Sequence, residues 1–420
     1  VMTGGVLGIS WNSSDNRALS KHRVSLFRDT TFLTDLATEL PGDAQSFNWR
    51  IPANQEQTNN YRIRVVATDD EGAESEAFSS TFTVGRAWQT QANMPTSLLR
   101  ALPASDGQYL YAVGGRTNTD KTSSVNTVNR FNPVTNEWTP LMSLPVLLSS
   151  GEAVHINGRI YVPGGQTEDL AIATTYIYDI ATNAWTTGAN APIAASAYSL
   201  GTDTNKNIIY VTGGLNAAVA SVANVRAYDV TANNWASLTP MRTARYSHEA
   251  AFIDGKLYVA GGIGIAGGLS NCEIYDPATQ QWKDIAPLNR PRAYAASTVY
   301  QDNAGNSYWL LVGGEDPTNS TTLGSAEVYD VRNNRWLVLN DGLSLGVART
   351  QTNGAAVGDY FYVIGGGTGS AAQPIPRTTV ERLKLPVNLT GISTPPVLAV
   401  PATQIAIPGN ELKFTVAASD

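Results

Sequence analysis

The sequence predicts an all-β protein built on a sixfold repeat, and three observations lead to this prediction. A Gly-Gly pair recurs six times at steps of 50, 49, 48, 52 and 52 residues, and each pair ends an apolar run of strand length. Five of the pairs are followed by an aromatic residue that stands seven positions before a tryptophan, with turn residues between them. β-Branched and aromatic runs separated by turn residues are typical of strands. Four such strands in a period of about 50 residues describe one blade of a β-propeller.

The repeat residues can be read off directly. The glycine pairs are Gly114-Gly115, Gly164-Gly165, Gly213-Gly214, Gly261-Gly262, Gly313-Gly314 and Gly365-Gly366. The aromatic pairs are Phe131 and Trp138, Tyr178 and Trp185, Tyr228 and Trp235, Tyr275 and Trp282, and Tyr329 and Trp336. Gly-Gly followed by Tyr-x6-Trp resembles the repeat signature of the kelch family, within the galactose-oxidase central-domain-like superfamily. This resemblance implies a six-bladed kelch β-propeller over residues 86–386, in which the signature residues make contacts within and between blades.

The two ends of the repeat are offset. Trp88 precedes the first glycine pair, whereas the last pair is followed by residues 380–383 and then by no tryptophan. We therefore expect the strand around Trp88 to complete the sixth blade beside residues 379–385. Closing the ring in this way removes the exposed strand edge that an open array would present.

The flanking segments do not share the repeat. Residues 1–85 alternate apolar and polar residues in short runs, which suits a β-sandwich. They resemble bacterial Ig-like or fibronectin type III modules, and the resemblance gives Tyr61 the role of a tyrosine corner. Residues 387–394 are interpreted as a linker, and residues 395–420 as the first strands of another Ig-like module. Such modules imply a piece of a longer, extracellular or cell-surface bacterial protein.

Composition excludes several classes of function. The chain has 28 Lys and Arg against 35 Asp and Glu, a net charge of −7, which argues against nucleic-acid binding. No apolar run approaches the 18 or so residues of a membrane-spanning helix. The single cysteine, Cys272, can form no intrachain disulfide.

Catalytic motifs are missing from the sequence. A copper centre of the galactose-oxidase type would need Cys272, Tyr246 and two histidines, but His155 and His248 are far apart in sequence. A six-bladed kelch sugar epimerase is a second precedent, and no catalytic residue aligns with it. The sequence contains no Gly-x-x-x-x-Gly-Lys-[Ser/Thr] phosphate-binding loop. The sequence thus predicts no catalytic residue, metal site or cofactor, while a carbohydrate-active or oxidase-type enzyme and a structural spacer stay as alternatives.

A set of charged residues is the candidate ligand site. Arg245 and Arg349 each stand 16 residues before the first glycine of their own pair, so we expect them to project equally into the central funnel. Guanidinium groups suit carboxylate, phosphate or sugar hydroxyl groups, although they can also brace neighbouring loops. The sequence predicts a monomeric, non-catalytic recognition module that binds a glycan or a protein on the funnel face. The candidate residues are Arg100, Arg116, Glu168, Arg245, Arg292, Glu315 and Arg349.

Overall fold

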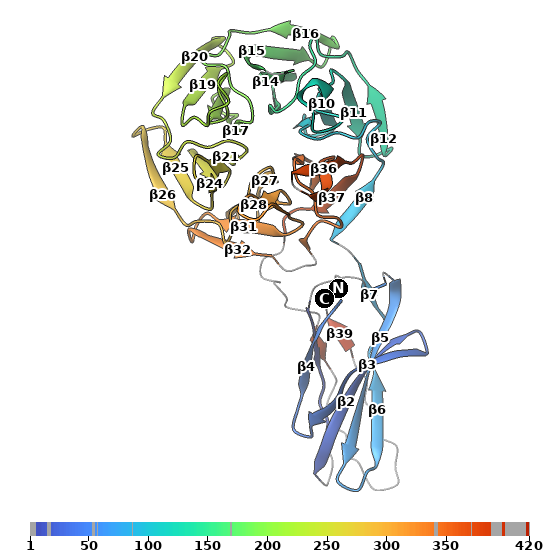
Figure 1. The fold of residues 1–420 in the computed structure, drawn as a ribbon. Helices are drawn as coiled ribbons and strands as arrows, with labels where there is room; N and C mark the ends of the chain where they lie inside the picture. The colour runs from blue at the N-terminus through green and yellow to red at the C-terminus, as the bar shows by residue number, and fades with distance from the viewer. Residues whose placement is uncertain are drawn as a thin grey trace. The chain divides into compact units, whose positions relative to one another are not determined.

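The protein is all-β, as the sequence predicts. The computed structural model describes residues 6–14, 18–52, 55–56, 58–85, 87–168, 170–339, 343–370, 372–387, 397–399 and 417–419. Within these residues η1 (Lys121–Ser123) is a short 3-10 helix, Leu343 is also in 3-10 conformation, and the rest is strands, turns and irregular segments (Figure 1). The chain divides into two compact units. The first comprises Val1–Ala87, Asn340–Leu343 and Asn388–Asp420, and the second Trp88–Leu339 and Ser344–Val387.

The first unit contains two antiparallel sheets. The larger sheet has the order β3-β2-β5-β6, with β7 also paired to β5, and the smaller sheet pairs β1 with β4. Alternate residues such as Trp11, Val24 and Ile63 point into a shared core and are buried. Tyr61 is fully buried, and its hydroxyl donates to the carbonyl oxygen of Glu56 at 2.8 Å, the contact expected of a tyrosine corner. The strands are β1 (Val6–Ser10), β2 (Leu19–Arg28), β3 (Thr31–Pro41), β4 (Ser46–Arg50), β5 (Thr58–Asp69), β6 (Glu74–Phe78) and β7 (Phe82–Val84).

The C-terminal segment is described only in part. β38 (Val397–Ala399) pairs with β39 (Ala417–Ser419), and both strands belong to the first unit. The other residues of the expected module 395–420 lie outside the described residues, as does the expected linker apart from Val387.

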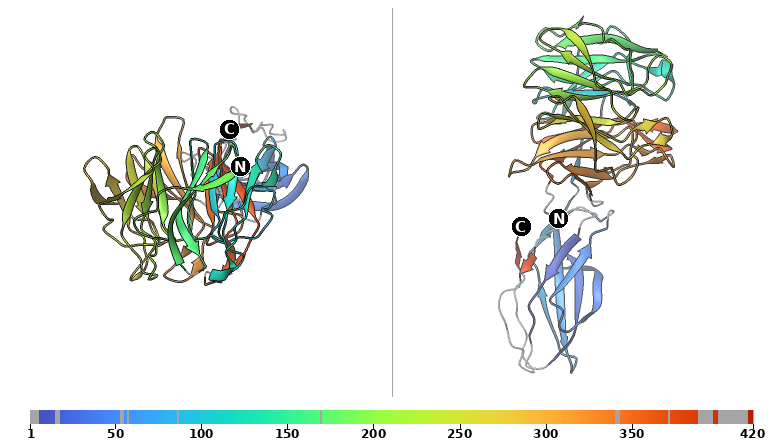
Figure 2. Two further views of the ribbon diagram at one scale, coloured as in Figure 1. Left: turned by 90° about the horizontal axis from the view of Figure 1, so that it is seen from above. Right: turned by 90° about the vertical axis from the view of Figure 1, so that its left-hand side faces the viewer.

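The second unit is a ring of six four-stranded antiparallel sheets, here called blades 1 to 6 (Figures 1 and 2). Short hairpins extend the loops after the Gly-Gly pairs of blades 4, 5 and 6: β23 (Ile263–Gly264) with β24 (Gly267–Gly268), β29 (Glu315–Asp316) with β30 (Thr321–Thr322), and β35 (Gly367–Ser370) with β36 (Gln373–Pro376).

From the inner to the outer strand, blades 1 to 3 are β9 (Leu102–Ser105), β10 (Leu110–Val113), β11 (Val128–Asn132), β12 (Glu137–Pro140); β13 (Val154–Ile156), β14 (Arg159–Thr167), β15 (Leu170–Asp179), β16 (Ala184–Thr187); and β17 (Ser199–Asp203), β18 (Ile208–Thr212), β19 (Val225–Asp229), β20 (Asn234–Leu238). Blades 4 to 6 are β21 (Glu249–Ile253), β22 (Lys256–Ala260), β25 (Cys272–Asp276), β26 (Gln281–Ile285); β27 (Ala296–Gln301), β28 (Ser307–Val312), β31 (Ala326–Asp330), β32 (Arg335–Val338); and β33 (Asn353–Val357), β34 (Tyr360–Ile364), β37 (Val380–Lys384), β8 (Trp88–Gln91).

The earliest strand of the propeller closes the ring. β8 pairs antiparallel with β37, in a register that sets Trp88 opposite Leu383. Trp88 is buried and its ring meets that of Phe361 edge-on. The outer strand of blade 6 therefore comes from the N-terminal side of blade 1.

The Gly-Gly pairs join each blade to the next. In all six blades the N–H of the second glycine donates to a carbonyl oxygen of the following blade, at 2.7 to 3.0 Å. A Cβ on the first glycine would lie only 2.3 to 3.0 Å from that same oxygen, and both glycines have positive φ. Glycine is needed at both positions because only glycine combines this backbone conformation with so close an approach. The accepting residues are Leu148, Ala195, Arg245, Arg292, Arg349 and, across the closure of the ring, Leu98.

The tryptophans join the blades at the outer edge. In five blades the indole N–H donates to a carbonyl oxygen of the preceding blade, at 2.9 to 3.1 Å. In blades 2, 3 and 5 the signature tyrosine donates to the turn asparagine five residues later, as Tyr178 does to Asn183. The repeat signature is thus a set of contacts within and between blades, as the sequence predicts.

A truncation tests the closure of the ring. A chain that begins at residue 93 lacks β8, so blade 6 keeps three strands and an open edge that promotes aggregation. We expect a lower Tm by differential scanning fluorimetry and increased light scattering, relative to a matched chain that begins at residue 86. Equal melting temperatures would show that the ring does not depend on β8.

A pair of glycine substitutions tests the contact between blades. Gly213 and Gly255 both have positive φ, so alanine costs a similar backbone strain of roughly 1–2 kcal/mol at either position. A Cβ on Gly213 would meet the Arg245 carbonyl oxygen at 2.4 Å, whereas a Cβ on Gly255 would have open space. Urea unfolding should show Gly213→Ala to be less stable than Gly255→Ala by about 1–3 kcal/mol, the typical cost of overpacking. Equal losses would contradict the steric argument.

Candidate functional site

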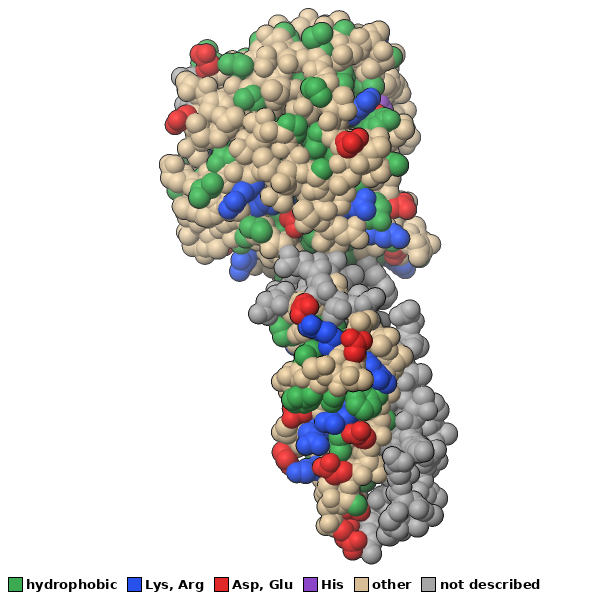
Figure 3. All heavy atoms as spheres, turned by 90° about the vertical axis from the view of Figure 1, so that its right-hand side faces the viewer, with side chains coloured by type: hydrophobic (Ala, Val, Ile, Leu, Met, Phe, Trp, Pro, Cys, Tyr) green, Lys and Arg blue, Asp and Glu red, His purple; other side chains and the backbone are tan. Residues whose placement is uncertain are grey.

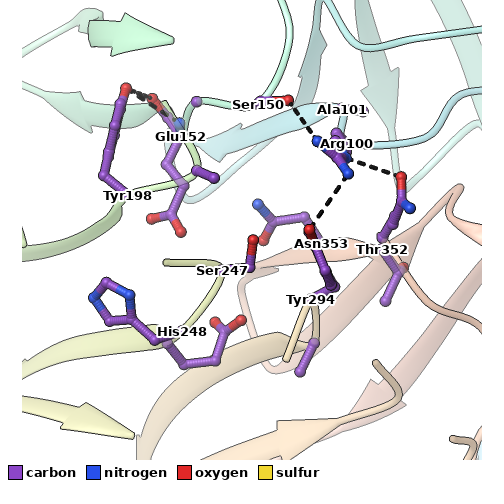
Figure 4. Close-up of a pocket in the computed structure, with 15 residues that line it drawn as sticks. Arg100, Ala101, Ser150, Glu152, Tyr198, Ser247, His248, Tyr294, Thr352 and Asn353 are labelled. Carbon is purple, nitrogen blue, oxygen red and sulfur yellow. Dashed lines mark hydrogen bonds between the residues drawn. The ribbon is translucent and has the colours of Figure 1, made fainter. Parts of the chain in front are cut away.

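One residue of each blade forms a ring around the propeller axis. In five blades this residue stands two positions before the first residue of the inner strand. In all six its backbone is left-handed, with φ between 50° and 55°. Four of the six backbone N–H groups donate to the carbonyl oxygen of the equivalent residue in the preceding blade, at 2.6 to 3.0 Å. All six residues line a pocket of about 60 Å³, here called the mouth pocket (Figure 4). The members of this axial ring are Arg100, Ser150, Ala197, Ser247, Tyr294 and Gln351.

Arg100 lies across the mouth pocket. Its guanidinium group donates to Gln351 Oε1 at 2.9 Å and to Ser150 Oγ at 3.2 Å, and it stacks over the ring of Tyr294. A longer contact of 3.4 Å reaches the hydroxyl of Tyr294 (Figure 4). These partners are neutral, so the hydrogen bonds position the cation without neutralising it. Of the candidate residues Arg100, Arg245, Arg292 and Arg349, only Arg100 lies at the axis.

Two carboxylates lie deeper in the channel, and the sequence analysis missed them. Glu152 and Glu249 line the mouth pocket and also a second cavity of about 150 Å³ beneath it. Glu152 Oε2 accepts a hydrogen bond from the Leu200 N–H, and Glu249 Oε2 accepts one from the Ser297 hydroxyl, both at 2.8 Å. Burial raises the pKa of Glu152 to about 8, and burial together with the Glu152 charge raises the pKa of Glu249 well above its usual range. The sequence signal that could have found these two residues is a glutamate next to small residues at the start of an inner strand.

The predicted placement of Arg245, Arg292 and Arg349 in the funnel is wrong. Their side chains are at most 1% exposed and form ion pairs inside blades 4, 5 and 6. Arg245 is typical, because it donates to the carbonyl oxygens of Gly261 and Asn271 and to Glu273 Oε1, at 2.7 to 2.9 Å. The other two pairs are Arg292 with Glu327 at 3.1 Å and Arg349 with Glu381 at 2.6 Å.

The three arginines do occupy the same structural position in their blades, as their spacing from the glycines predicts, but this position is buried. They are the residues whose carbonyl oxygens accept the glycine N–H of the preceding blade, and the axial ring residue comes two positions later. Blades 1 and 2 have Leu98 and Leu148 at this position, which are also buried. Blade 3 has Ala195 there, and Arg226 of β19 reaches the Gly213 carbonyl oxygen instead, at 3.4 Å.

The other predicted residues serve the loops. Arg116 is buried and bridges blades 1 and 2, since it donates to Ser149 Oγ at 2.8 Å and to Gln166 Oε1 at 2.7 Å. Glu315 is also buried and accepts a hydrogen bond from the Thr350 hydroxyl of blade 6 at 2.7 Å. Glu168 is exposed at the tip of the β14–β15 hairpin. These residues therefore do not converge on the axis, and the ion-pair partners of Arg245 and Arg349 are Glu273 and Glu381 rather than Glu168 or Glu315.

The residues considered for a copper centre lie apart. Cys272 is buried on β25, and burial raises the pKa of its thiol to about 12, as expected of an inert core cysteine. His155 accepts the Gly158 N–H in the β13–β14 turn, whereas His248 borders the channel. The described part of the chain holds no group of three or more His, Cys, Asp and Glu side chains that could bind a metal ion.

Four loops on the same face as the mouth pocket carry exposed aliphatic side chains. Each loop follows a Gly-Gly pair, so by the strand order all four open on the end of the propeller where the inner strands begin. We call them the rim residues: Leu170, Val219, Ile265 and Ile375, which are 61%, 59%, 100% and 62% exposed.

Comparison with known proteins gives the same assignment as the geometry. A KLHDC2/KLHL20/DRC7 Kelch-repeats domain matches residues 150–366, more than half of the chain, and a Kelch motif matches residues 99–145. The chain belongs to the kelch-repeat family. A Kre9/KNH-like N-terminal Ig-like domain matches residues 1–84, so the first unit is an Ig-like domain of that kind.

Curated kelch-like proteins and scruins are similar to 59 to 65% of this chain. Kelch-like protein 25 of Xenopus tropicalis is 25% identical over 282 residues, which cover 65% of this chain and 45% of that protein. Alpha-scruin of Limulus polyphemus is 24% identical over 291 residues, covering 63% and 31%. Kelch-like protein 34 of Homo sapiens is 24% identical over 265 residues, covering 59% and 40%. The chain thus spans less than half the length of these relatives.

The buried ion pairs lead to a stability prediction. Arg245→Met leaves Glu273 charged and buried without its partner, so we expect a loss of about 3–5 kcal/mol. Arg242→Met is the matched control, because Arg242 is 56% exposed and pairs with Asp284 at the surface, where the loss should be about 0–1 kcal/mol. Urea unfolding measures both changes, and an unaltered midpoint for Arg245→Met would contradict the structural role.

Proposed function

We propose that the propeller is a recognition module that binds a polypeptide segment of a partner protein on the face bearing the mouth pocket. The observation that supports this most directly is the set of four exposed rim residues at equivalent loops around a polar centre. Isolated exposed aliphatic side chains are ordinary, as on the side of the propeller seen in Figure 3. Four of them at corresponding loops on one face are the apolar contacts that a protein partner would cover.

Backbone conformation at the rim adds to this argument. Val219 has a φ of 60°, a left-handed conformation that is unfavourable for a β-branched residue. Strain of this kind costs about 1–3 kcal/mol and is concentrated at binding sites. In this proposal the strain serves to present the Val219 side chain to the partner.

Arg100 supplies the polar anchor. Its guanidinium group donates to neutral groups. The Glu315 carboxylate interacts with it electrostatically but is hydrogen-bonded to the Thr350 hydroxyl instead. A partly exposed, positioned guanidinium group binds a carboxylate with favourable geometry. We propose that an acidic group of the partner occupies this position.

A glycan has less support as the ligand. The two axial cavities, of about 60 and 150 Å³, are smaller than the roughly 300–1,000 Å³ of usual small-molecule pockets. A purely structural spacer has less support as well, because the channel is lined by charged groups rather than filled. The proposal retains an extracellular or cell-surface location, which fractionation of the source cells would test.

Peptide selection tests the proposed face. A random dodecapeptide library would be panned against the full chain, and the affinities of the selected peptides measured by calorimetry. Val219→Asp with Ile265→Asp should weaken binding at least tenfold, about 1.4 kcal/mol, and Arg100→Gln should weaken peptides that contain an acidic residue. The control is Val134→Asp, because Val134 is 92% exposed in the β11–β12 turn, at the opposite strand ends. Failure to select peptides, or equal binding by the loop-face variants and the unchanged chain, would refute the proposal.

A further inference from the structure

Two carboxylates and one amide share one level of the central channel. The inner-strand position two residues after the axial ring holds Leu102, Glu152, Ser199, Glu249, Ala296 and Asn353 in blades 1 to 6. Carboxylate and amide groups therefore occupy blades 2, 4 and 6. Because each blade is the same unit rotated about the axis, alternate blades place these side chains about 120° apart. Glu152, Glu249 and Asn353 all line both the mouth pocket and the cavity beneath it.

Each of Glu152, Glu249 and Asn353 accepts a hydrogen bond that positions its side chain. Glu152 is held by the Leu200 N–H of the next blade, and Glu249 by the Ser297 hydroxyl of the next blade. Asn353 Oδ1 accepts the N–H of Gly354 at 2.8 Å, so the amide presents its oxygen in a defined direction. The acceptors are thus positioned by the propeller framework.

Two residues that line the mouth pocket carry a buried polar atom without a hydrogen-bond partner. Among the described side chains, Ser247 Oγ and His248 Nδ1 are buried without a hydrogen-bond partner, and their residues are 7% and 2% exposed. Figure 4 shows Ser247, His248 and the carboxylate of Glu152 around one space. Buried polar atoms in native proteins nearly always have a partner, so two such atoms beside one cavity point to a missing donor.

The tautomer of His248 follows from its neighbour. Thr212 Oγ1 has one proton, which it donates to the Ser199 carbonyl oxygen at 3.1 Å. The 2.8 Å contact between Thr212 Oγ1 and His248 Nε2 must then be donated by the imidazole N–H. Burial and the charge of Arg245 hold the pKa of His248 well below its usual range, so the ring is neutral. His248 Nδ1 therefore carries a lone pair and is an acceptor.

We propose that this level of the channel binds a primary ammonium group, supplied by a lysine side chain of the docked partner. An ammonium group has three N–H donors and no acceptor, which matches three acceptors arranged around an axis. Its charge offsets the two carboxylates, whose burial is otherwise unfavourable. The site is two residues, or about 6.5 Å, below the axial ring, a depth that the four-carbon stem of lysine can span.

A metal ion is the less favoured occupant. The described residues contain no group of three or more His, Cys, Asp and Glu side chains that could hold a metal ion, and the third acceptor at this level is the neutral amide of Asn353. The identity of the ammonium donor rests on the proposed function, whereas the binding of an ammonium group does not. A small amine therefore tests the site independently of any partner protein.

Calorimetry with the full chain at pH 8 provides the test, with n-butylammonium chloride as the probe. We expect one saturable site, and at least tenfold weaker binding by the Glu152→Gln and Glu249→Gln variants. Two control probes should not bind: n-butanol, which has no charge, and tetramethylammonium, which has no N–H donor. Glu137→Gln, an exposed substitution on β12, is the matched control and should bind like the unchanged chain. Arg100→Gln removes a positive charge from the mouth, so it should bind the amine at least as tightly while losing acidic peptides.

Proton release gives a second measurement. Burial raises the pKa of both Glu152 and Glu249, so binding of an ammonium group is coupled to loss of protons from these carboxyl groups. Affinity should therefore rise from pH 6 to pH 9, and the enthalpy should depend on the buffer. Tyr198, His248, Arg292 and Arg100 are the other titratable or charged groups near this site. Because the carboxylates are already destabilised by burial, both Gln variants should melt at or above the temperature of the unchanged chain at pH 8.

Several results would overturn the inference. They are the absence of saturable n-butylammonium binding, unchanged binding in both Gln variants, or tighter binding of Ca²⁺ or K⁺ than of the amine. Loss of peptide binding with retained amine binding would refute the proposed face and leave the ammonium site standing.

Discussion

The hydrogen bond from the second glycine of each Gly-Gly pair to the next blade is the contact on which the propeller depends. It occurs six times at 2.7 to 3.0 Å, and the sixth occurrence, from Gly366 to Leu98, crosses the closure of the ring. The first glycine makes room for the accepting oxygen, and the second directs its N–H toward it. A blade cannot bury its faces alone, so these repeated contacts turn six marginal sheets into one closed unit.

The residue whose carbonyl oxygen accepts this hydrogen bond has a different side chain in different blades. The side chain attached to the accepting residue enters its own blade, where it is leucine in blades 1 and 2 and arginine paired with glutamate in blades 4 to 6. In blade 3, Arg226 reaches the corresponding glycine carbonyl from β19. Each of the arginines in blades 4 to 6 forms an ion pair inside its own blade. Desolvation there lowers the pKa of Arg292 and Arg349 despite their carboxylate partners. The side chains of these arginines are therefore enclosed within their blades and are not presented on the funnel face.

Two residues further along, the left-handed axial ring turns the chain into the inner strands and defines the entrance of the channel. This geometry separates the charges by level, with Arg100 at the mouth and Glu152 and Glu249 below it. The loops after the glycines carry the rim residues outward on the same face. One backbone arrangement thus combines an apolar rim, a cationic mouth and an acidic channel, which is the combination that the recognition proposal uses.

The sequence by itself determined the all-β class, the sixfold repeat and the structural role of the Gly-Gly, Tyr and Trp residues. These properties depend on local strand patterns and on a signature that is repeated, so the period alone reveals them. It did not determine which face of each inner strand meets the axis, because a shift of one residue moves every side chain of a strand to the other face. Arg245 and Glu249 lie four residues apart and both read as charged residues near a strand start, yet one is enclosed within its blade and the other faces the channel. Only the tertiary structure decides between them, since the register of neighbouring blades, and not any local pattern, fixes where each charge finds its partner.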